Sequence, residues 1–228
     1  MKKKTVFKVM TDIAMTVCLL LLMPYELVGT LPHEIIGTVM IVLLIVHHIL
    51  NRRWTASLFK GKYTFLRIVQ TALVVLILVC SLGSAVSGIA LSRHLYRFLP
   101  SFLSASFARK VHMLCAYWGM VLMSLHLGFH WSMMMNMARK IFRKPSKVRR
   151  WVVRLCGFAT AGYGVYAFVK RGIADYLFLK IAFVFFDHSQ PVVFFLLDYA
   201  ACMGTFVLIG YYLSRLLTRI GRRKAAAQ

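Results

Sequence analysis

The sequence is poor in acidic residues. It contains six Asp and Glu against 29 Lys and Arg, which gives a formal net charge of +23. In a soluble protein such an excess would point to a nucleic-acid partner. Here the basic residues lie between long apolar runs, where they orient a membrane protein, so we exclude nucleic acid as the partner.

Several cofactor motifs are also absent. The five cysteines lie singly inside apolar runs and none forms CxxC or CxxCH, which argues against a disulfide framework and a covalently attached c-type haem. The sequence has no glycine-rich flavin or nucleotide motif, so the chain is not a self-contained reductase. It also has no HExxH, which disfavours a zinc enzyme.

Long apolar runs dominate the sequence. Hydrophobic residues make up 60% of the 228 residues. The runs predict an all-α integral membrane protein with six transmembrane helices, at about 6–28, 31–50, 64–90, 110–135, 151–169 and 192–214. The first run resembles a signal peptide, but no small-residue cleavage site follows it, so we expect an uncleaved helix.

The predicted helices divide into two parts of one integrated membrane domain. Residues 1–137 form a four-helix core, and residues 138–228 add two further transmembrane helices. Between these last two helices, the segment 172–191 is aromatic and interrupted by charged residues. We expect it to lie as a helix in the outer membrane surface.

Local signals refine the helix ends. Pro24 should loosen the end of the first helix, Thr30 is expected to cap the second, and Pro32 falls in its first turn. Lys8 and Asp12 are four residues apart, so they are expected to form an ion pair on the first helix. In the third span, Gly83 and Gly88 are expected to mark close helix packing or a bend, and in the fifth span close packing is expected at Gly157, Gly162 and Gly164.

The basic residues orient the chain. Of the 29 Lys and Arg, 22 lie near the N-terminus, after the second span, after the fourth span or near the C-terminus. The opposite side holds the remaining seven: Arg93, Arg97, Arg109, Lys110, Lys170, Arg171 and Lys180. The positive-inside rule then places both termini in the cytoplasm and the chain in the cytoplasmic membrane.

Two of the spans carry matched histidines. His33 and His47 are 14 residues apart in the second span, and so are His112 and His126 in the fourth. Fourteen helical residues rise about 21 Å and return to nearly the same face. Both spans run from outside to inside, so His33 should be level with His112 and His47 with His126.

These pairs predict two haem sites. A strongly polar side chain inside a bilayer is costly and usually functional, although a single histidine could simply bond a neighbouring helix. Imidazole is a common iron ligand, and two axial histidines leave the iron no open position. The pattern therefore predicts two haems that carry electrons, one at each membrane face.

Two further histidines keep the ligand choice open. His48 adjoins His47, and His130 follows His126 by four residues. Either could replace its neighbour as ligand or bond a haem propionate. The equal spacing favours His47 and His126. His126 and His130 also have the spacing of a zinc pair, but no carboxylate lies nearby in that helix.

Other residues suit the rest of a haem. Cations that could pair with propionates flank both histidine tiers, although they also fit ordinary interface anchors: Arg109 and Lys110 outside, Arg52 and Arg53 inside. Gly37 and Gly119 could let a flat porphyrin approach the helix backbone, or could serve plain packing.

These residues resemble a known family. The Pro32-His33-Glu34 start, the His47-His48 pair and Trp54, with the histidines and Trp131 of the fourth span, are similar to the flavinylation-associated cytochrome family. That family is related in architecture to cytochrome b and ferric-reductase-type membrane proteins. The likeness covers the first four spans, and the last two, with FFDHSQP and LLDYA, look like an extension found in some members.

The resemblance implies a function. It implies a di-haem core, with His33, His47, His112 and His126 as ligands, that passes electrons to an extracytoplasmic flavoprotein carrying covalent flavin. Membrane quinol or a cytoplasmic-side donor would supply the electrons. The alternatives are a haem subunit of a quinol-oxidising or metal-reducing complex, a small metal-ion transporter, and an assembly subunit without cofactor.

Overall fold

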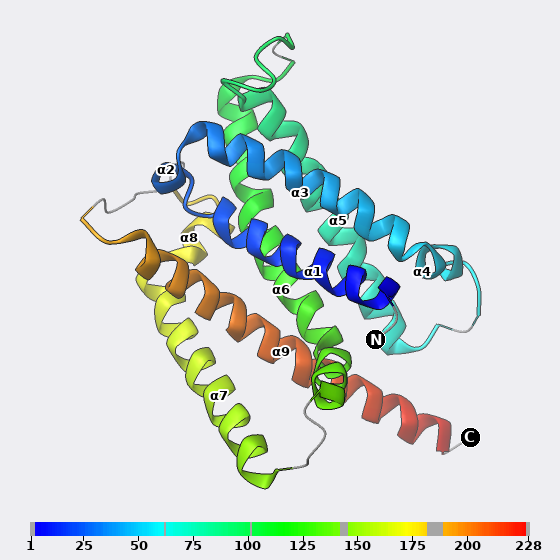
Figure 1. Ribbon diagram of the computed structural model, residues 1–228. Coiled ribbons are helices and arrows are strands. Elements are labelled where there is room, and N and C mark those ends of the chain that lie inside the picture. Colours follow the sequence, from blue (N-terminus) through cyan, green and yellow to red (C-terminus); the bar gives the residue numbers. More distant parts are fainter. Residues whose placement is uncertain (1–2, 62, 101, 142–145, 182–188, 227–228) are drawn as a thin grey trace. The chain divides into compact units, whose positions relative to one another are not determined.

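The computed structural model describes residues 3–61, 63–100, 102–141, 146–181 and 189–226 (Figure 1). Within those ranges the regular structure is α-helical and contains no strand. Six helices are long and apolar enough to cross a membrane: α1 (Lys3–Leu22), α3 (Thr30–Leu50), α5 (Phe65–Leu91), α6 (Ala105–Ile141), α7 (Lys147–Lys170) and α9 (Val192–Ala226). The chain is an all-α, multi-pass membrane protein, as its apolar runs predict.

The helix surfaces suit a lipid environment. Helix α3 has no fully buried residue, and Val39, Val42 and Ile45 on it are each about half exposed. In water such a surface would be unfavourable, whereas in a bilayer lipid tails cover it and only the backbone must be hydrogen-bonded internally. The exposed apolar side chains are therefore the lipid-facing part of the fold.

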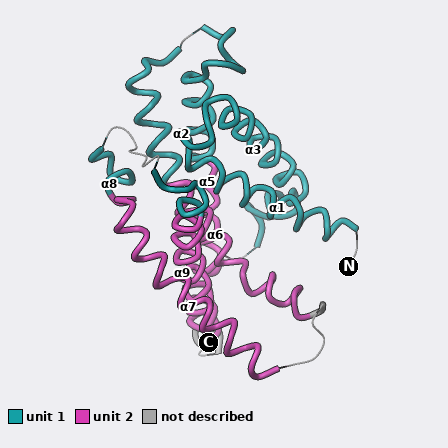
Figure 2. Tube along the Cα trace, turned by 60° about the vertical axis from the view of Figure 1, so that its left-hand side comes forward, with its two compact units in different colours: residues 1–62, 79–117, 175–196 teal, residues 63–78, 118–174, 197–228 magenta. Residues whose placement is uncertain are grey.

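The chain divides into two compact units (Figure 2). Unit 1 comprises Met1–Lys62, Val79–Tyr117 and Asp175–Leu196, and unit 2 comprises Tyr63–Leu78, Trp118–Ala174 and Leu197–Gln228. Helices α5 and α6 each contribute one part to unit 1 and the rest to unit 2. Of the four predicted ligands, His33, His47 and His112 belong to unit 1, and His126 belongs to unit 2.

In unit 1, α1 and α3 pack against each other along their lengths (Figure 1). The first helix was expected to reach residue 28, but α1 ends at Leu22 and a separate turn, α2 (Tyr25–Val28), follows. Pro24 lies between α1 and α2. It accounts for the break in the helix, because proline disfavours helical conformation in the residue before it. The expected cap at Thr30 is also wrong: Gly29 occupies the cap with φ 92°, and Pro32 falls in the first turn as predicted.

Several helices extend further than their apolar runs. Helix α6 begins five residues before and ends six residues after the predicted 110–135, and α9 continues to Ala226 rather than 214. The predicted basic loop after α3 contains a further helix, α4 (Arg52–Ser57). Hydropathy marks only the part of a helix inside lipid, whereas Lys and Arg are good helix formers that continue it into water.

The segment 172–191 differs from the expected surface helix. Its described part contains only the short helix α8 (Ile173–Leu177), and Leu179 has a positive φ of 52° that no continuous helix could include. Residues 182–188 lie outside the described residues. Ile173 and Tyr176 are buried, and Tyr176 stacks on Tyr117 of α6 with ring centroids 4.8 Å apart. Helix α8 is therefore a packed element.

In unit 2, small residues bring helices together. A Cβ atom on Gly164 of α7 would overlap the carbonyl of Ala201 on α9, so these backbones touch as predicted. The neighbouring Gly157 and Gly162 meet nothing within 4 Å, and the packing expected of them is wrong. Similar contacts between α6 and α9 need glycine at Gly128.

Candidate functional site

His33 of α3 and His112 of α6 lie face to edge inside unit 1. Their ring centroids are 6.1 Å apart and their planes differ by 65°. Two imidazoles that bind one metal ion from opposite sides, with metal–nitrogen bonds of about 2 Å, have ring centroids roughly 6 Å apart. The structure thus brings the predicted outer pair to a separation that fits axial ligation of one iron.

Helix α5 fixes the ring of His112. The Nδ1 atom lies 3.0 Å from the carbonyl oxygen of Ser84, and because a carbonyl only accepts, Nδ1 must carry the proton. Ser87 Oγ lies 3.2 Å from the same nitrogen and gives its own hydrogen to the Gly83 carbonyl at 2.5 Å. This arrangement leaves the lone pair on Nε2, as in histidines that bind metals.

A glycine makes room for this ring. A Cβ atom on Gly88 of α5 would lie 3.2 Å from Cε1 of His112, closer than ordinary contact. The close packing expected at Gly88 is therefore confirmed, with His112 as the neighbour. Gly37 instead lies against Leu22 of α1, Gly119 is buried in α6, and their contact with a porphyrin stays a prediction.

His33 carries an orphaned polar atom. Among the described side chains, its Nδ1 is the only buried nitrogen or oxygen without a hydrogen-bond partner. The ring of Tyr25 meets it edge-on, with centroids 5.1 Å apart. Buried polar atoms in folded proteins nearly always have a partner. The hydrogen-bonding capacity of this nitrogen is therefore not used by the described part of the chain.

Glu34, the next residue, anchors the loop after α5. Its carboxylate accepts hydrogen bonds from Ser92 Oγ at 2.7 Å and from the backbone N–H groups of Arg93 and Leu95, each at 2.8 Å. The backbone N–H of His94 also donates to it, at 3.2 Å. The Pro-His-Glu start of α3 therefore combines a candidate ligand with the anchor of a loop, a role that the sequence did not reveal.

His47 has a defined hydrogen-bond network on α1 and α3. Its Nδ1 lies 2.8 Å from Asp12 Oδ1, and the Asn51 amide lies 3.3 Å from its Nε2. The expected Lys8–Asp12 pair is wrong, because Lys8 donates to Asn51 Oδ1 at 2.9 Å instead. The edge-on ring of His48 is 5.9 Å away, and the network favours His47 as the oriented histidine.

His126 and His130 lie together in unit 2. Their ring centroids are 4.7 Å apart and their planes differ by 61°. His47 belongs to unit 1, so its pairing with His126 stays a prediction. The equal 14-residue spacing remains the reason to prefer His126 over His130 as the ligand.

The cations predicted for propionates are exposed. Arg52 and Arg53 begin α4, and Arg109 and Lys110 lie in the second turn of α6. None of the four forms an ion pair with any described residue. They lie near helix ends, where they suit either pairing with a propionate or anchoring at the membrane surface.

A second polar cluster, in unit 2, was not predicted. Asp198 of α9 is fully buried, and its carboxylate accepts from Tyr163 Oη at 2.5 Å, Lys170 Nζ at 3.2 Å and Arg171 Nη2 at 2.7 Å. A charge inside an apolar run, as in LLDYA, was the available signal. The saturated hydrogen bonding makes this cluster a clamp between the ends of α7 and α9.

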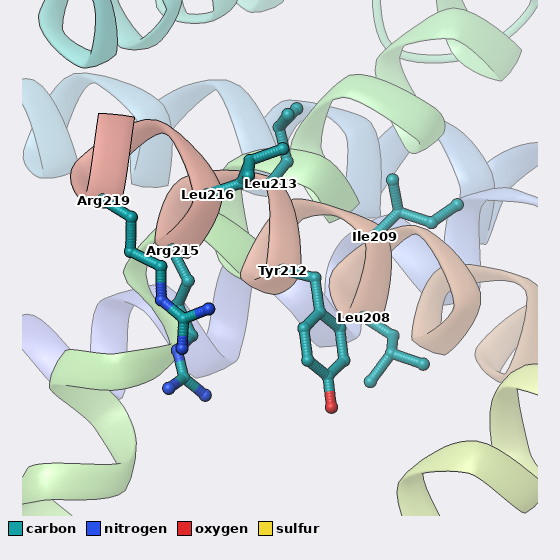
Figure 3. Close-up of a pocket in the computed structure, with 7 residues that line it drawn as sticks. All are labelled: Leu208, Ile209, Tyr212, Leu213, Arg215, Leu216 and Arg219. Carbon is teal, nitrogen blue, oxygen red and sulfur yellow. The ribbon is translucent and has the colours of Figure 1, made fainter. Parts of the chain in front are cut away.

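Figure 3 shows a pocket on the surface of α9. Leucine, isoleucine and tyrosine side chains line it, with the guanidinium groups of Arg215 and Arg219 at one end (Figure 3). It contains none of the predicted site residues.

Comparisons with protein-family models, with curated proteins and with solved structures found no match.

Proposed function

We propose that this chain carries electrons across a membrane by holding b-type haem between histidines of α3 and α6. The observation that supports the proposal most is the His33–His112 pair. The two rings come from separate spans and lie 6.1 Å apart, one held in a single tautomer by Ser84 and the other with an orphaned nitrogen. His112 hydrogen-bonds helix α5, but a histidine that served only to join helices would not leave its Nδ1 without a partner, as His33 does among the described residues.

The residues of this site have distinct roles in the proposal. His33 and His112 hold the iron, and the Ser84 carbonyl keeps His112 Nδ1 protonated and its ring fixed. Haem, when bound, supplies a reversible one-electron iron couple. An iron held by two histidines would have no open position for oxygen or substrate, which suits electron transfer.

A second haem belongs to the same proposal. His47 and His126 are its ligands, and His48 and His130 are the alternates. The hydrogen bond from His47 Nδ1 to Asp12 supports His47, because histidines that bind metals commonly donate their other N–H to a carboxylate.

The orientation and the partners complete the proposal. The basic ends of the spans lie in the cytoplasm with both termini, and the chain resides in the cytoplasmic membrane. Membrane quinol or a cytoplasmic-side donor provides electrons, and an extracytoplasmic flavoprotein or other redox protein receives them. The flavoprotein partner is supported by the resemblance to the flavinylation-associated cytochrome family.

Haem content of purified variants tests the proposal. Wild-type protein produced with abundant haem should contain two haems per chain. His33→Ala and His112→Ala should each lose the same one, and His47→Ala and His126→Ala should each lose the other. His94→Ala is the matched control, because His94 lies in the exposed loop after α5 and should leave both haems in place.

Equal haem content in His33→Ala and wild type would contradict the outer site. Colourless wild-type protein would contradict the whole proposal.

A further inference from the structure

One face of α9 in unit 2 combines an apolar hollow with two arginines (Figure 3). The residues that line the hollow recur at intervals of three or four, so they share one face of the helix. They are Leu208, Ile209, Tyr212, Leu213, Arg215, Leu216 and Arg219. The hollow has a volume of about 610 Å³, within the range of about 300–1,000 Å³ that small-molecule sites have.

This face crosses the boundary between lipid tails and headgroups. At 1.5 Å per residue, Leu208 lies about 24 Å along the helix from Val192, where α9 begins, and Arg215 lies about 35 Å from it. The hydrocarbon core of a bilayer is about 30 Å thick, and the headgroup regions bring the total to about 40–45 Å. With Val192 at one edge of the hydrocarbon, Leu208 therefore lies among the lipid tails and Arg215 among the headgroups at the other edge.

The two guanidinium groups lie together at one end of the hollow (Figure 3). Neither forms an ion pair with a carboxylate in the described part of the chain. Like charges four residues apart on a helix repel each other, and an anion between them relieves that repulsion. Arg215 is also held in place, because its Nη1 donates to Tyr211 Oη at 3.0 Å. A guanidinium has five N–H donors, so Arg215 retains donors for a ligand.

A ligand that matches both parts of this face has a phosphate at one end and an alkyl chain at the other. The parallel N–H donors of a guanidinium suit the oxygens of a phosphate. The apolar side chains suit an acyl chain, and Tyr212 is a fixed wall, because its ring stacks on Phe158 of α7 with centroids 6.1 Å apart. Two positive charges favour a lipid with net negative charge over a zwitterionic lipid.

We propose that this face of α9 is a binding site for an anionic phospholipid. The phosphate pairs with Arg215 and Arg219, and an acyl chain lies in the apolar hollow. General attraction of basic residues to a membrane surface needs only charge, whereas this site needs the charge and the hollow together. A two-fold symmetric pair of chains joined through this face would instead bring four arginines together, which repulsion disfavours.

Native mass spectrometry of the purified full-length chain tests the proposal by counting bound lipids. Phosphatidylglycerol and phosphatidylcholine with the same oleoyl chains are titrated separately. Wild type should bind the first phosphatidylglycerol about tenfold or more tightly than phosphatidylcholine. Arg215→Gln and Arg219→Gln should each weaken phosphatidylglycerol binding about fivefold, which is the contribution of one basic residue at an anionic lipid surface. Binding of phosphatidylcholine should not change in either variant.

Two further variants separate the hollow from the charge. Ile209 is about half exposed, so Ile209→Trp fills the hollow without disturbing the packed interior and should weaken phosphatidylglycerol binding. Arg150→Gln is the matched control, because it removes one exposed basic residue at the start of α7, in the same unit. It should leave lipid binding unchanged.

Equal affinity of wild type for the two lipids would overturn the proposal, and this comparison needs no variant to fold. Unchanged phosphatidylglycerol binding in both arginine variants, or an equal loss in Arg150→Gln, would show a general attraction to charge and no site. Unchanged binding in Ile209→Trp would overturn the role of the hollow. A dimer that binds neither lipid would assign the face to a second copy of the chain and overturn the proposal.

Discussion

At the scale of single residues, the outer histidine pair is shaped by atoms that the sequence pattern does not mark. The tautomer of His112 depends on the Ser84 carbonyl, and the space for its ring depends on Gly88, both on α5. Spacing along a helix predicted the histidines, but the backbone of a third helix sets the orientation of His112.

Enlarging Gly88 should disturb one haem and not the other. In Gly88→Ala the new methyl group lies 3.2 Å from Cε1 of His112, so the ring must shift by a few tenths of an ångström. We expect a shifted absorption band for one haem, and loss of that haem in Gly88→Leu. Gly157→Ala is the control, because a Cβ there meets nothing within 4 Å. An unchanged spectrum in Gly88→Leu would contradict the assignment of His112.

Asp12 illustrates a limit of sequence reasoning at this scale. Its spacing from Lys8 predicted a pair on one helix, which in surface helices contributes only about 0.3–0.5 kcal/mol. Asp12 instead bonds His47 on α3, and Lys8 bonds Asn51, which caps the C-terminus of α3. Choosing between these partners requires knowing that α1 packs on α3.

At the scale of elements, unit 2 joins its helices by glycine contacts and by one buried carboxylate. The six spans could be predicted because apolar runs have the length of a bilayer. Their ends could not, because α6 and α9 continue into polar sequence. Among the glycines of α7, hydropathy could not tell which contacts α9: Gly164 does, whereas Gly157 and Gly162 meet nothing within 4 Å.

Removing the Asp198 charge should loosen the α7–α9 contact. The carboxylate is 1% exposed and forms ion pairs with both Lys170 and Arg171. Breaking a buried pair from one side costs about 3 kcal/mol or more, because the remaining charge is left unpaired. Asp198→Asn should therefore lower the thermal unfolding midpoint of the purified protein.

The exposed Asp175–Lys180 pair provides the comparison. These side chains are 40% and 68% exposed, and such a pair contributes about 0–1 kcal/mol. Asp175→Asn should leave the unfolding midpoint nearly unchanged. Equal midpoints for Asp198→Asn and wild type would show that the Asp198 cluster does not clamp the helices.

At the scale of the whole molecule, the direction in which each helix crosses the membrane decides two things. It decides on which side the basic residues lie and at which depth each histidine lies. The positive-inside rule assigns the cytoplasmic side, and the parallel direction of the second and fourth spans assigns the level of each histidine. The His33–His112 contact agrees with that level assignment. The sequence could predict this pairing because it depends only on helix direction and rise.

Reporter fusions test the orientation. Alkaline phosphatase, which is active only outside the cytoplasm, should be inactive when fused after Gln228 and active when fused after Arg97. The reason is that 22 of the 29 basic residues lie on the side of the termini. An active C-terminal fusion would contradict the proposed orientation.

The most direct measurement of the central claim is the electron paramagnetic resonance spectrum of the oxidised wild-type protein. An iron with two axial imidazoles and no open position should be low-spin. We predict two low-spin ferric haem signals per chain, one of which becomes high-spin or disappears in His112→Ala. A wild-type spectrum with only high-spin iron, or with no haem signal from protein produced with abundant haem, would contradict the account.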